Sequence, residues 1–285
     1  MCLRIMGEAD IPAGMRLKEI SGWNQTAEDW GRFLNASPNG CFVAEVDSRV
    51  VGTAATICYE DKFAWIGMVL VDPVYRGRGI GTRLLEKTIA FLDEVKIPTM
   101  KLDATPLGKP LYEKIGFVTE YEIERLILKR GPEQLSNTQP TDAQRPISNS
   151  ELEIVMARDS ELFGADRSGL LKSLHQESPE LTVAAWNAGN LIGYVFGRKG
   201  SFADHLGPLM ATEVETCHKL VAAFLRSSGR ENLIVDCLKS AGISVDLLRQ
   251  QGFRYARPLT RMFRGKNRFP GKHGELCAIL GPEFG

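Results

Sequence analysis

The sequence predicts a mixed α/β (α+β) fold of two tandem domains, each a twisted, mostly antiparallel sheet flanked by helices. Three observations indicate this fold. The chain of 285 residues is about twice as long as a usual domain. A run of short strands is followed by an amphipathic helix. The same order of elements then recurs after a polar segment. The predicted units are residues 1–130, a linker over 131–150, and residues 151–285.

The first predicted domain begins with a meander of antiparallel strands. Apolar runs separated by short polar turns predict strands at 42–46, 50–59 and 63–71. From Gly79 the period changes, and Ile80, Leu84 and Leu85 begin an apolar face with helical spacing. The remaining elements are a strand near 100–103, a short helix near 109–114 and a closing strand from 117 to about 128.

Three blocks of the second half match the first half in the same order. They are Val43-Ala44 with Val183-Ala184, Gly67-Met68-Val69 with Gly207-Pro208-Leu209, and residues 111–117 with 247–253. Short apolar strands can match by chance, but the shared order favours a tandem duplication. Between the halves, residues 131–150 contain three prolines and little to bury, which is typical of a linker.

Composition and charge exclude several classes of protein. With 44% hydrophobic and 25% charged residues, the chain has the composition of a globular protein. The 35 basic residues balance the 35 acidic ones, so nucleic acid and acidic membranes are not expected partners. No apolar stretch reaches the roughly 18 residues of a membrane span, and we expect a cytoplasmic protein. The cysteines and histidines lack metal-site spacing, so no metal is expected.

The most informative segment is a basic, glycine-rich turn between the third strand and the first long helix. The turn contains Arg76, Gly77, Arg78, Gly79 and Gly81. Glycines let backbone N–H groups converge on an anion, and the start of a helix adds partial positive charge. The segment therefore predicts a pyrophosphate cradle. Its spacing fits neither a Rossmann loop nor a P-loop.

This segment resembles the coenzyme A signature of the GNAT superfamily of N-acetyltransferases. The matching pattern is Arg76-x-x-Gly79-x-Gly81 after Val69-x-Val71-x-Pro73, and Leu111-Tyr112-x-x-x-Gly116-Phe117 resembles the second signature of the superfamily. The resemblance covers residues 15–130. Segments 22–26, 65–68, 102–105 and 163–167 resemble a bacterial and archaeal branch with two tandem GNAT domains. The resemblance implies direct transfer of an acetyl group from acetyl-CoA to a small-molecule or peptide amine in a ternary complex.

The resemblance also implies roles for individual residues. Backbone groups of Val69 and Val71 would hold the pantetheine arm, and Tyr112 would act as the general acid for the CoA thiolate. A phenol with a pKa of about 10 is a suitable donor to a thiolate whose pKa is roughly 8.5. The implied coenzyme contacts are Val69, Val71, Arg76, Gly77, Arg78, Gly79, Ile80, Gly81, Thr82 and Thr105.

Two positions depart from the family pattern. Thr105 stands where many relatives have Asn, so coenzyme contacts there can differ. Trp65 stands where some branches have a glutamate general base. The base therefore remains open among Glu60, Asp61, Asp103 and a water chain.

The acceptor site is less clearly marked in the sequence. Its candidate residues are Trp23, Asn24, Trp30 and Trp65, although large aromatic side chains more often belong to a core. A monomer is plausible because the two domains can pair within the chain, but the sequence leaves the oligomeric state open. A non-catalytic acetyl-CoA sensor and a tandem-domain interaction protein are the alternatives to an enzyme.

The second domain is predicted to be degenerate. An offset of 140 places Thr216, Cys217, Lys219 and Val221 where Arg76 and the three glycines stand in the first domain. Leu248 takes the place of Tyr112, so this domain would lack both the anion cradle and the proton donor. We expect it to serve as a scaffold or as a wall of the acceptor site.

Overall fold

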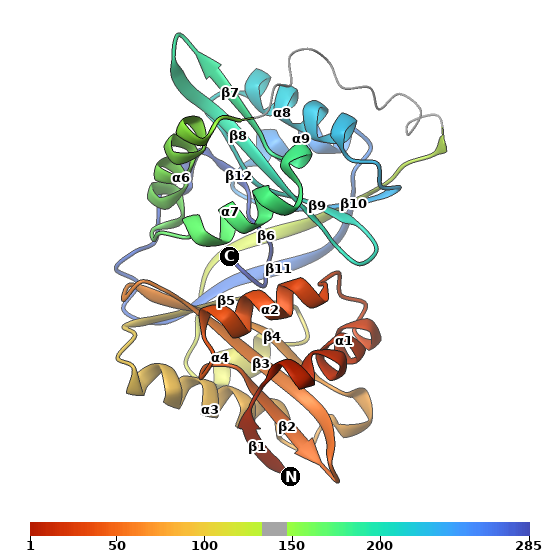
Figure 1. Cartoon of the computed structure of the whole chain (residues 1–285), viewed down its shortest axis with the longest axis vertical. Helices are drawn as coiled ribbons and strands as arrows, with labels where there is room; N and C mark the ends of the chain where they lie inside the picture. Colours follow the sequence, from red (N-terminus) through yellow and green to blue (C-terminus); the bar gives the residue numbers. More distant parts are fainter. Residues whose placement is uncertain (133–146) are drawn as a thin grey trace.

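The structure, a computed structural model, describes residues 1–132 and 147–285 and consists of two α/β halves (Figure 1). The predicted linker lies mostly between these ranges, outside the described residues. The N-terminal half contains β1 (Cys2–Ile5), α1 (Ile11–Ile20), α2 (Ala27–Ala36), β2 (Phe42–Val46), β3 (Arg49–Tyr59), β4 (Phe63–Val71), α3 (Ile80–Glu94), β5 (Thr99–Ala104), α4 (Lys109–Lys114) and β6 (Val118–Lys129). The C-terminal half contains α6 (Asn149–Phe163), α7 (Ser168–Glu177), β7 (Val183–Asn187), β8 (Asn190–Lys199), β9 (Asp204–Ala211), α8 (Val214–Ser227), β10 (Asn232–Leu238), α9 (Gly242–Gln250), β11 (Arg254–Gly265) and β12 (Leu276–Ala278).

The mixed α/β class predicted from the sequence is confirmed, and the strands and helices expected between residues 42 and 128 are all present. The sequence patterns did not indicate α1 and α2. The start of α2 nevertheless carries a local signal, because Thr26 and Asp29 form a capping box. In this box each side chain accepts a hydrogen bond from the backbone N–H of the other residue.

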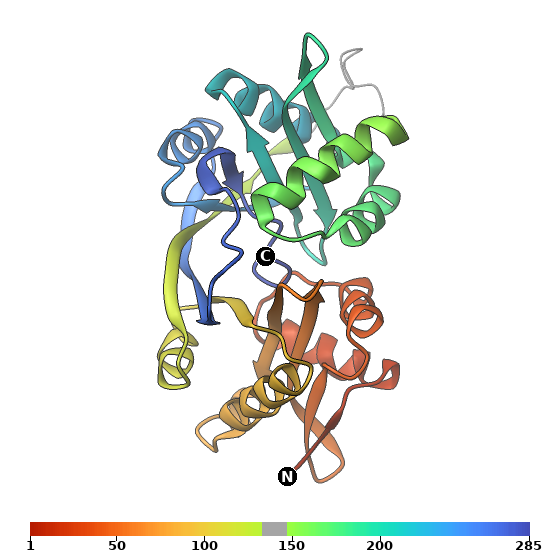
Figure 2. The ribbon, with the colours of Figure 1, turned by 90° about the vertical axis from the view of Figure 1, so that its left-hand side faces the viewer.

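The strands of the described residues form one continuous sheet. Their order is β1-β2-β3-β4-β5-β11-β6-β10-β12-β9-β8-β7. The halves exchange their long closing strands: β11 pairs with β5 of the N-terminal half, and β6 pairs with β10 of the C-terminal half. These two strands also pair with each other, and they run side by side along the junction (Figure 2). Residues 1–130 and 151–285 thus remain a predicted division of the sequence, while in the fold each half completes the sheet of the other.

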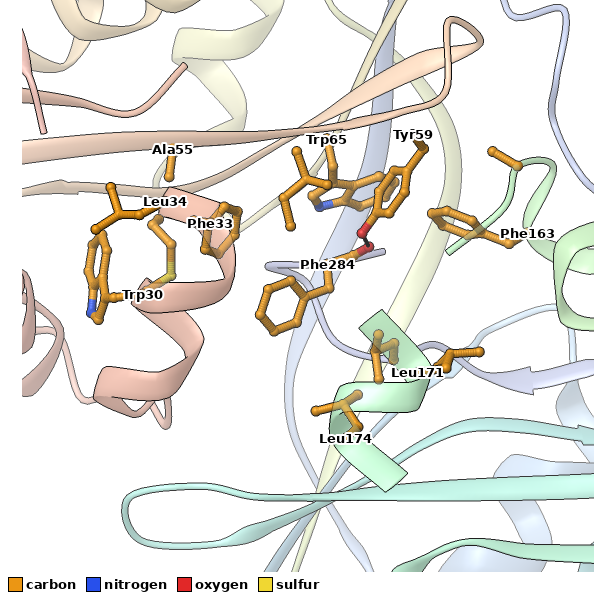
Figure 3. Close-up of a cluster of buried hydrophobic side chains, with 14 of the residues drawn as sticks. Trp30, Phe33, Leu34, Ala55, Tyr59, Trp65, Phe163, Leu171, Leu174 and Phe284 are labelled. Atoms are coloured by element: carbon orange, nitrogen blue, oxygen red, sulfur yellow. Dashed lines mark hydrogen bonds between the residues drawn. The ribbon is translucent and has the colours of Figure 1, made fainter. Parts of the chain in front are cut away.

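The halves also share one hydrophobic core. It joins Phe33 of α2 and Trp65 of β4 to Phe163 of α6 and Leu171 of α7 (Figure 3). Phe284, close to the end of the chain, lies between them and stacks on Phe33 with ring centroids 5.1 Å apart. Because this apolar surface is buried between the halves, its burial stabilises their association as well as each half.

The repeat predicted from the sequence is visible in equivalent strands. Val43-Ala44 lies in β2 and Val183-Ala184 in β7, and each of these strands pairs antiparallel with the long strand that follows it. The second matching block, Gly67-Met68-Val69 and Gly207-Pro208-Leu209, lies in β4 and β9. In both strands this block lies at a register shift in the pairing with the preceding strand. In the part of the chain that the structure describes, no helix is long and apolar enough to span a membrane.

Candidate active site

The site begins where β4 and β5 separate. These parallel strands pair only at Ala64–Met100 and Trp65–Lys101. Beyond them the edge of β4 that faces β5 has no partner strand in the part of the chain that the structure describes. Met68 has a left-handed φ of 54° next to a register shift, and its carbonyl oxygen accepts a 2.7 Å hydrogen bond from the Thr53 hydroxyl. This bulge turns the backbone around Val69 and Val71 toward the opening.

A groove of about 800 Å³ follows this opening. It runs over the last residues of β4, the glycine-rich turn, the start of α3 and the loop before α4. The coenzyme contacts expected from the sequence that line it are Val69, Val71, Arg76, Gly77, Gly79, Ile80, Gly81, Thr82 and Thr105. Arg78 does not line it, because its guanidinium lies over the Tyr75 ring at 5.1 Å and donates to the Val74 carbonyl oxygen.

The glycine-rich turn leaves the first amides of α3 without a cap. Gly77 and Gly79 have φ values of 74° and 73°, which side chains with a Cβ rarely adopt. Gly79 is the N-cap of α3 and has no side chain to accept a hydrogen bond. The N–H groups of the first turn therefore face the groove with the positive end of the helix dipole. Arg76 lies beside them and donates to the Val71 carbonyl oxygen at 3.1 Å.

Tyr112, on α4, also lines the groove. Its side chain is 9% exposed and packs edge-on against the Phe117 ring, with centroids 6.0 Å apart. Burial raises the pKa of Tyr112 well above its usual range, so the phenol stays protonated at neutral pH. No group among the described residues forms a hydrogen bond with its hydroxyl, which leaves the O–H available to a ligand.

A smaller pocket of about 40 Å³ continues from the inner end of the groove. The residues that line both cavities are Trp23, Val69, Asp103, Thr105, Tyr112 and Arg257. The inner pocket also receives Arg125 from β6, Leu259 from β11, and Pro282 and Glu283 from the C-terminal segment. Both halves of the chain therefore form its walls. The sequence patterns missed Arg125, Arg257 and Glu283, because no local motif surrounds them.

Most charged side chains around the pocket are paired. Asp103 forms a two-pronged ion pair with Arg261, with both N–O distances 2.8 Å. Arg125 pairs in the same way with Asp236 at 2.7 Å. Burial opposes ionisation of Asp236, but Arg125 outweighs it and holds the pKa of Asp236 well below its usual range. Within each of these pairs, the positive and negative charges neutralise each other.

Glu283 is paired through only one of its oxygens. Its Oε1 accepts a hydrogen bond from Arg198, which also pairs with Asp29 of α2. The side chain is 2% exposed, and Oε2 has no hydrogen-bond partner among the described residues. A buried carboxylate oxygen without a donor is uncommon and costs free energy unless a ligand or water completes it.

Of the acceptor candidates, Trp23 lines both cavities, whereas Asn24, Trp30 and Trp65 line neither. Asn24 is buried between the halves, where its amide donates to the Ala203 carbonyl oxygen at 2.9 Å. Trp30 is fully buried in the shared core. Trp65 is fully buried too, and its indole N–H donates to the Pro282 carbonyl oxygen at 3.0 Å.

Of the general-base candidates, only Asp103 lines the pocket. Glu60 and Asp61 occupy the turn between β3 and β4 and line neither cavity. Glu60 instead accepts a 2.8 Å hydrogen bond from the backbone N–H of Asp166, in the other half. Among the described residues, no cluster of three or more potential metal ligands is present.

The offset of 140 does not place the second cradle correctly. Residues 72–79 separate β4 from α3, but only Thr212 and Glu213 separate β9 from α8. Thr216, Cys217, Lys219 and Val221 therefore lie within α8 and not in a turn before it. The N-cap of α8 is the acidic Glu213, whose charge would repel a phosphate. Leu248, the counterpart of Tyr112, is buried in the core of the C-terminal half.

Comparisons with known proteins agree with this architecture. Models of an acetyltransferase (GNAT) domain match residues 37–119 and 155–278. The chain is 28% identical over 266 residues to holothin acyltransferase from a Pseudoalteromonas species, covering 92% of this chain and 87% of that protein. It is 28% identical to the uncharacterised N-acetyltransferase YitH of Bacillus subtilis, covering 98% and 96%. A proposed acetyltransferase from Pyrococcus horikoshii has the same fold, with a TM-score of 0.78, 22% identity, and coverage of 100% and 95%.

Proposed function

Because this chain belongs to the GNAT acetyltransferase family, with a GNAT domain in each half, we propose that it transfers the acetyl group of acetyl-CoA to an amine by direct attack in a ternary complex. The observation that carries the proposal is that the groove and the inner pocket adjoin and share Tyr112 in their walls. A coenzyme in the groove and an amine in the pocket would meet beside Tyr112.

The coenzyme would be held by backbone groups. The amides from Gly77 to Thr82, together with Arg76, face the part of the groove that suits a pyrophosphate. The unpaired edge of β4 at Val69 and Val71 suits an amide-containing arm, because its N–H and C=O groups can pair with that arm as a strand would. Acetyl-CoA would supply the activated acetyl group.

Tyr112 would donate its proton, or a hydrogen bond, to the sulfur that leaves. Burial raises the pKa of the Tyr112 phenol, and the same apolar surroundings would also raise the pKa of a thiol formed beside it. The free hydroxyl and the protonated state at neutral pH both suit this role.

We assign the removal of the amine proton to Glu283. It and Asp103 are the carboxylates that line the pocket, and Asp103 is fully engaged by Arg261. Glu283 keeps one oxygen free, so it can accept a proton directly or through a water molecule.

The proposal is tested by incubating the full chain with acetyl-CoA and a panel of small amines and short peptides while the release of free thiol is measured. The expected result is amine-dependent release that falls roughly 10²- to 10⁴-fold in Tyr112→Phe, with unchanged affinity for acetyl-CoA. Binding of acetyl-CoA without release of free thiol in the presence of any amine would instead support a coenzyme sensor. Absence of both would support an interaction protein.

A further inference from the structure

Arg257 is a cation at the centre of the site that the proposed chemistry does not use. It lies on β11 immediately after a bulge at Ala256, and it lines both the groove and the inner pocket. Directly opposite it in the β11–β6 ladder is Arg125, which carries the same charge. Like charges placed opposite each other across two strands are unfavourable unless an anion compensates them.

Of these two arginines, only Arg125 forms an ion pair with a carboxylate among the described residues. Arg125 is neutralised by Asp236, and Asp103, which lines both cavities, is neutralised by Arg261. The half-buried guanidinium of Arg257 has no hydrogen bond or ion pair among the described residues. Burial and the neighbouring Arg125 both lower the pKa of Arg257, and the attraction of Asp236 does not outweigh them, so the charge is held there at a cost. An anionic ligand would offset that cost.

We propose that Arg257 binds a carboxylate of the amine acceptor, so that the substrates of this protein are small amines that also carry a carboxylate. This inference rests on the proposed function. A planar guanidinium with free N–H groups matches a carboxylate in two-pronged geometry. In such an acceptor, the amino group would face Glu283 while the carboxylate is held by Arg257.

The position of Arg257 favours the acceptor over the coenzyme as the source of the anion. The phosphates of the coenzyme have their own cradle at the start of α3, in the outer part of the groove. Arg257 instead lines the junction with the inner pocket, next to Tyr112 and Asp103. A coenzyme phosphate is the competing source of the same chemistry, and the experiment separates the two.

The experiment compares probes matched apart from the carboxylate, and each kcat/KM is calculated for the unprotonated amine. The full chain is assayed with acetyl-CoA and a set of amino acids, each paired with its amide. We expect the wild type to prefer the acids. In Arg257→Gln, kcat/KM for the acids should fall by about tenfold to a hundredfold, while the values for the amides and the affinity for acetyl-CoA stay the same. Arg257→Lys should recover part of the loss, and Arg254→Gln, an exposed neighbour on β11, should behave as wild type.

A binding measurement keeps this inference separate from the proposed function. Calorimetry with the CoA-loaded protein should show a higher affinity for N-acetyl amino acids than for their amides. This difference in affinity should disappear in Arg257→Gln. That result supports the carboxylate site even if no acetyl transfer is found. Equal use of acids and amides by the wild type would overturn the inference while leaving acetyl transfer intact. A loss of acetyl-CoA affinity in Arg257→Gln would overturn it in favour of a coenzyme phosphate.

Discussion

The hydroxyl of Tyr59 on β3 donates a 2.8 Å hydrogen bond to the carbonyl oxygen of Phe284, 225 positions later in the chain. Both side chains are buried in the core that the two halves share (Figure 3). Burial raises the pKa of Tyr59 well above its usual range, so it stays a donor. The bond holds the C-terminal segment between the halves, and the same segment supplies Pro282 and Glu283 to the inner pocket.

Replacing Tyr59 by Phe should therefore destabilise the whole protein. The substitution removes the only donor described for the Phe284 carbonyl and leaves that oxygen buried and unpaired, which costs about 1–3 kcal/mol. The free energy of unfolding measured in urea checks this. Tyr255→Phe is the matched control, because Tyr255 is 51% exposed and its loss of a hydroxyl should change stability by less than about 0.5 kcal/mol. Equal effects in the two variants would contradict the expected role.

A chain that ends after Lys129 should fail to fold. It would lose β11, which separates β5 from β6 in the sheet, and it would leave both β5 and β6 without that partner. It would also lose Phe284 from the shared core. Circular dichroism should show no cooperative thermal transition for this fragment, whereas the full chain shows one. A fragment that melts cooperatively and binds acetyl-CoA would show that the N-terminal half is independent.

Replacing Gly79 by Ala should weaken the binding of acetyl-CoA. A side chain at φ 73° strains the turn by about 1–2 kcal/mol and displaces the amides that face the groove, so the Kd measured by calorimetry should rise about tenfold or more. Gly189→Ala is a matched control, because Gly189 has a φ of 80°, open space around it and a position in the β7–β8 turn. It should lose similar stability and keep its affinity.

Replacing Glu283 by Gln should change how the rate depends on pH. Without its proton acceptor, the protein should lose roughly 10²-fold in kcat/KM near neutral pH, and the difference should shrink as rising pH deprotonates the amine in solution. Asp29→Asn removes the other carboxylate paired with Arg198 but does not line the pocket. Its pH profile should run parallel to that of the wild type. If the pH profiles of both variants ran parallel to that of the wild type, the proton acceptor would be water or another residue.

Glu120 on β6 should make stability depend on pH in the acid range. Burial opposes its ionisation, but His273, Lys101 and Asn267 outweigh burial and lower the pKa of Glu120 to about 2. Because the folded pKa lies below the unfolded one, the stabilisation is present above about pH 4.5 and is lost as pH falls toward 2. It amounts to about 3 kcal/mol.

Glu120→Gln is the variant that isolates this contribution. The gap in the free energy of unfolding between wild type and variant should narrow as pH is lowered from 6 to about 2. A gap that is independent of pH would mean that Glu120 acts through packing alone.

The sequence alone determined the local structure of residues 42–128 and the glycine-rich turn that lines the groove. The strands at 42–71, the helix after Gly79 and the Tyr112 motif are encoded by apolar periodicity and by glycines within a few residues of one another. Local signals of this kind survive in any tertiary arrangement. The predicted repeat could be found for the same reason, because its blocks keep their order along the chain.

Only the tertiary structure decided how the halves share strands and what forms the inner pocket. Strands β6 and β11 have the same apolar pattern whichever sheet they join, so their exchange depends on which edges pair best in the assembled fold. The same exchange brings Arg125, Arg257 and Glu283 to Tyr112 from distant parts of the chain. Trp30 and Trp65, which looked like pocket residues, are instead buried, because a large apolar side chain gains most free energy in the core between the halves.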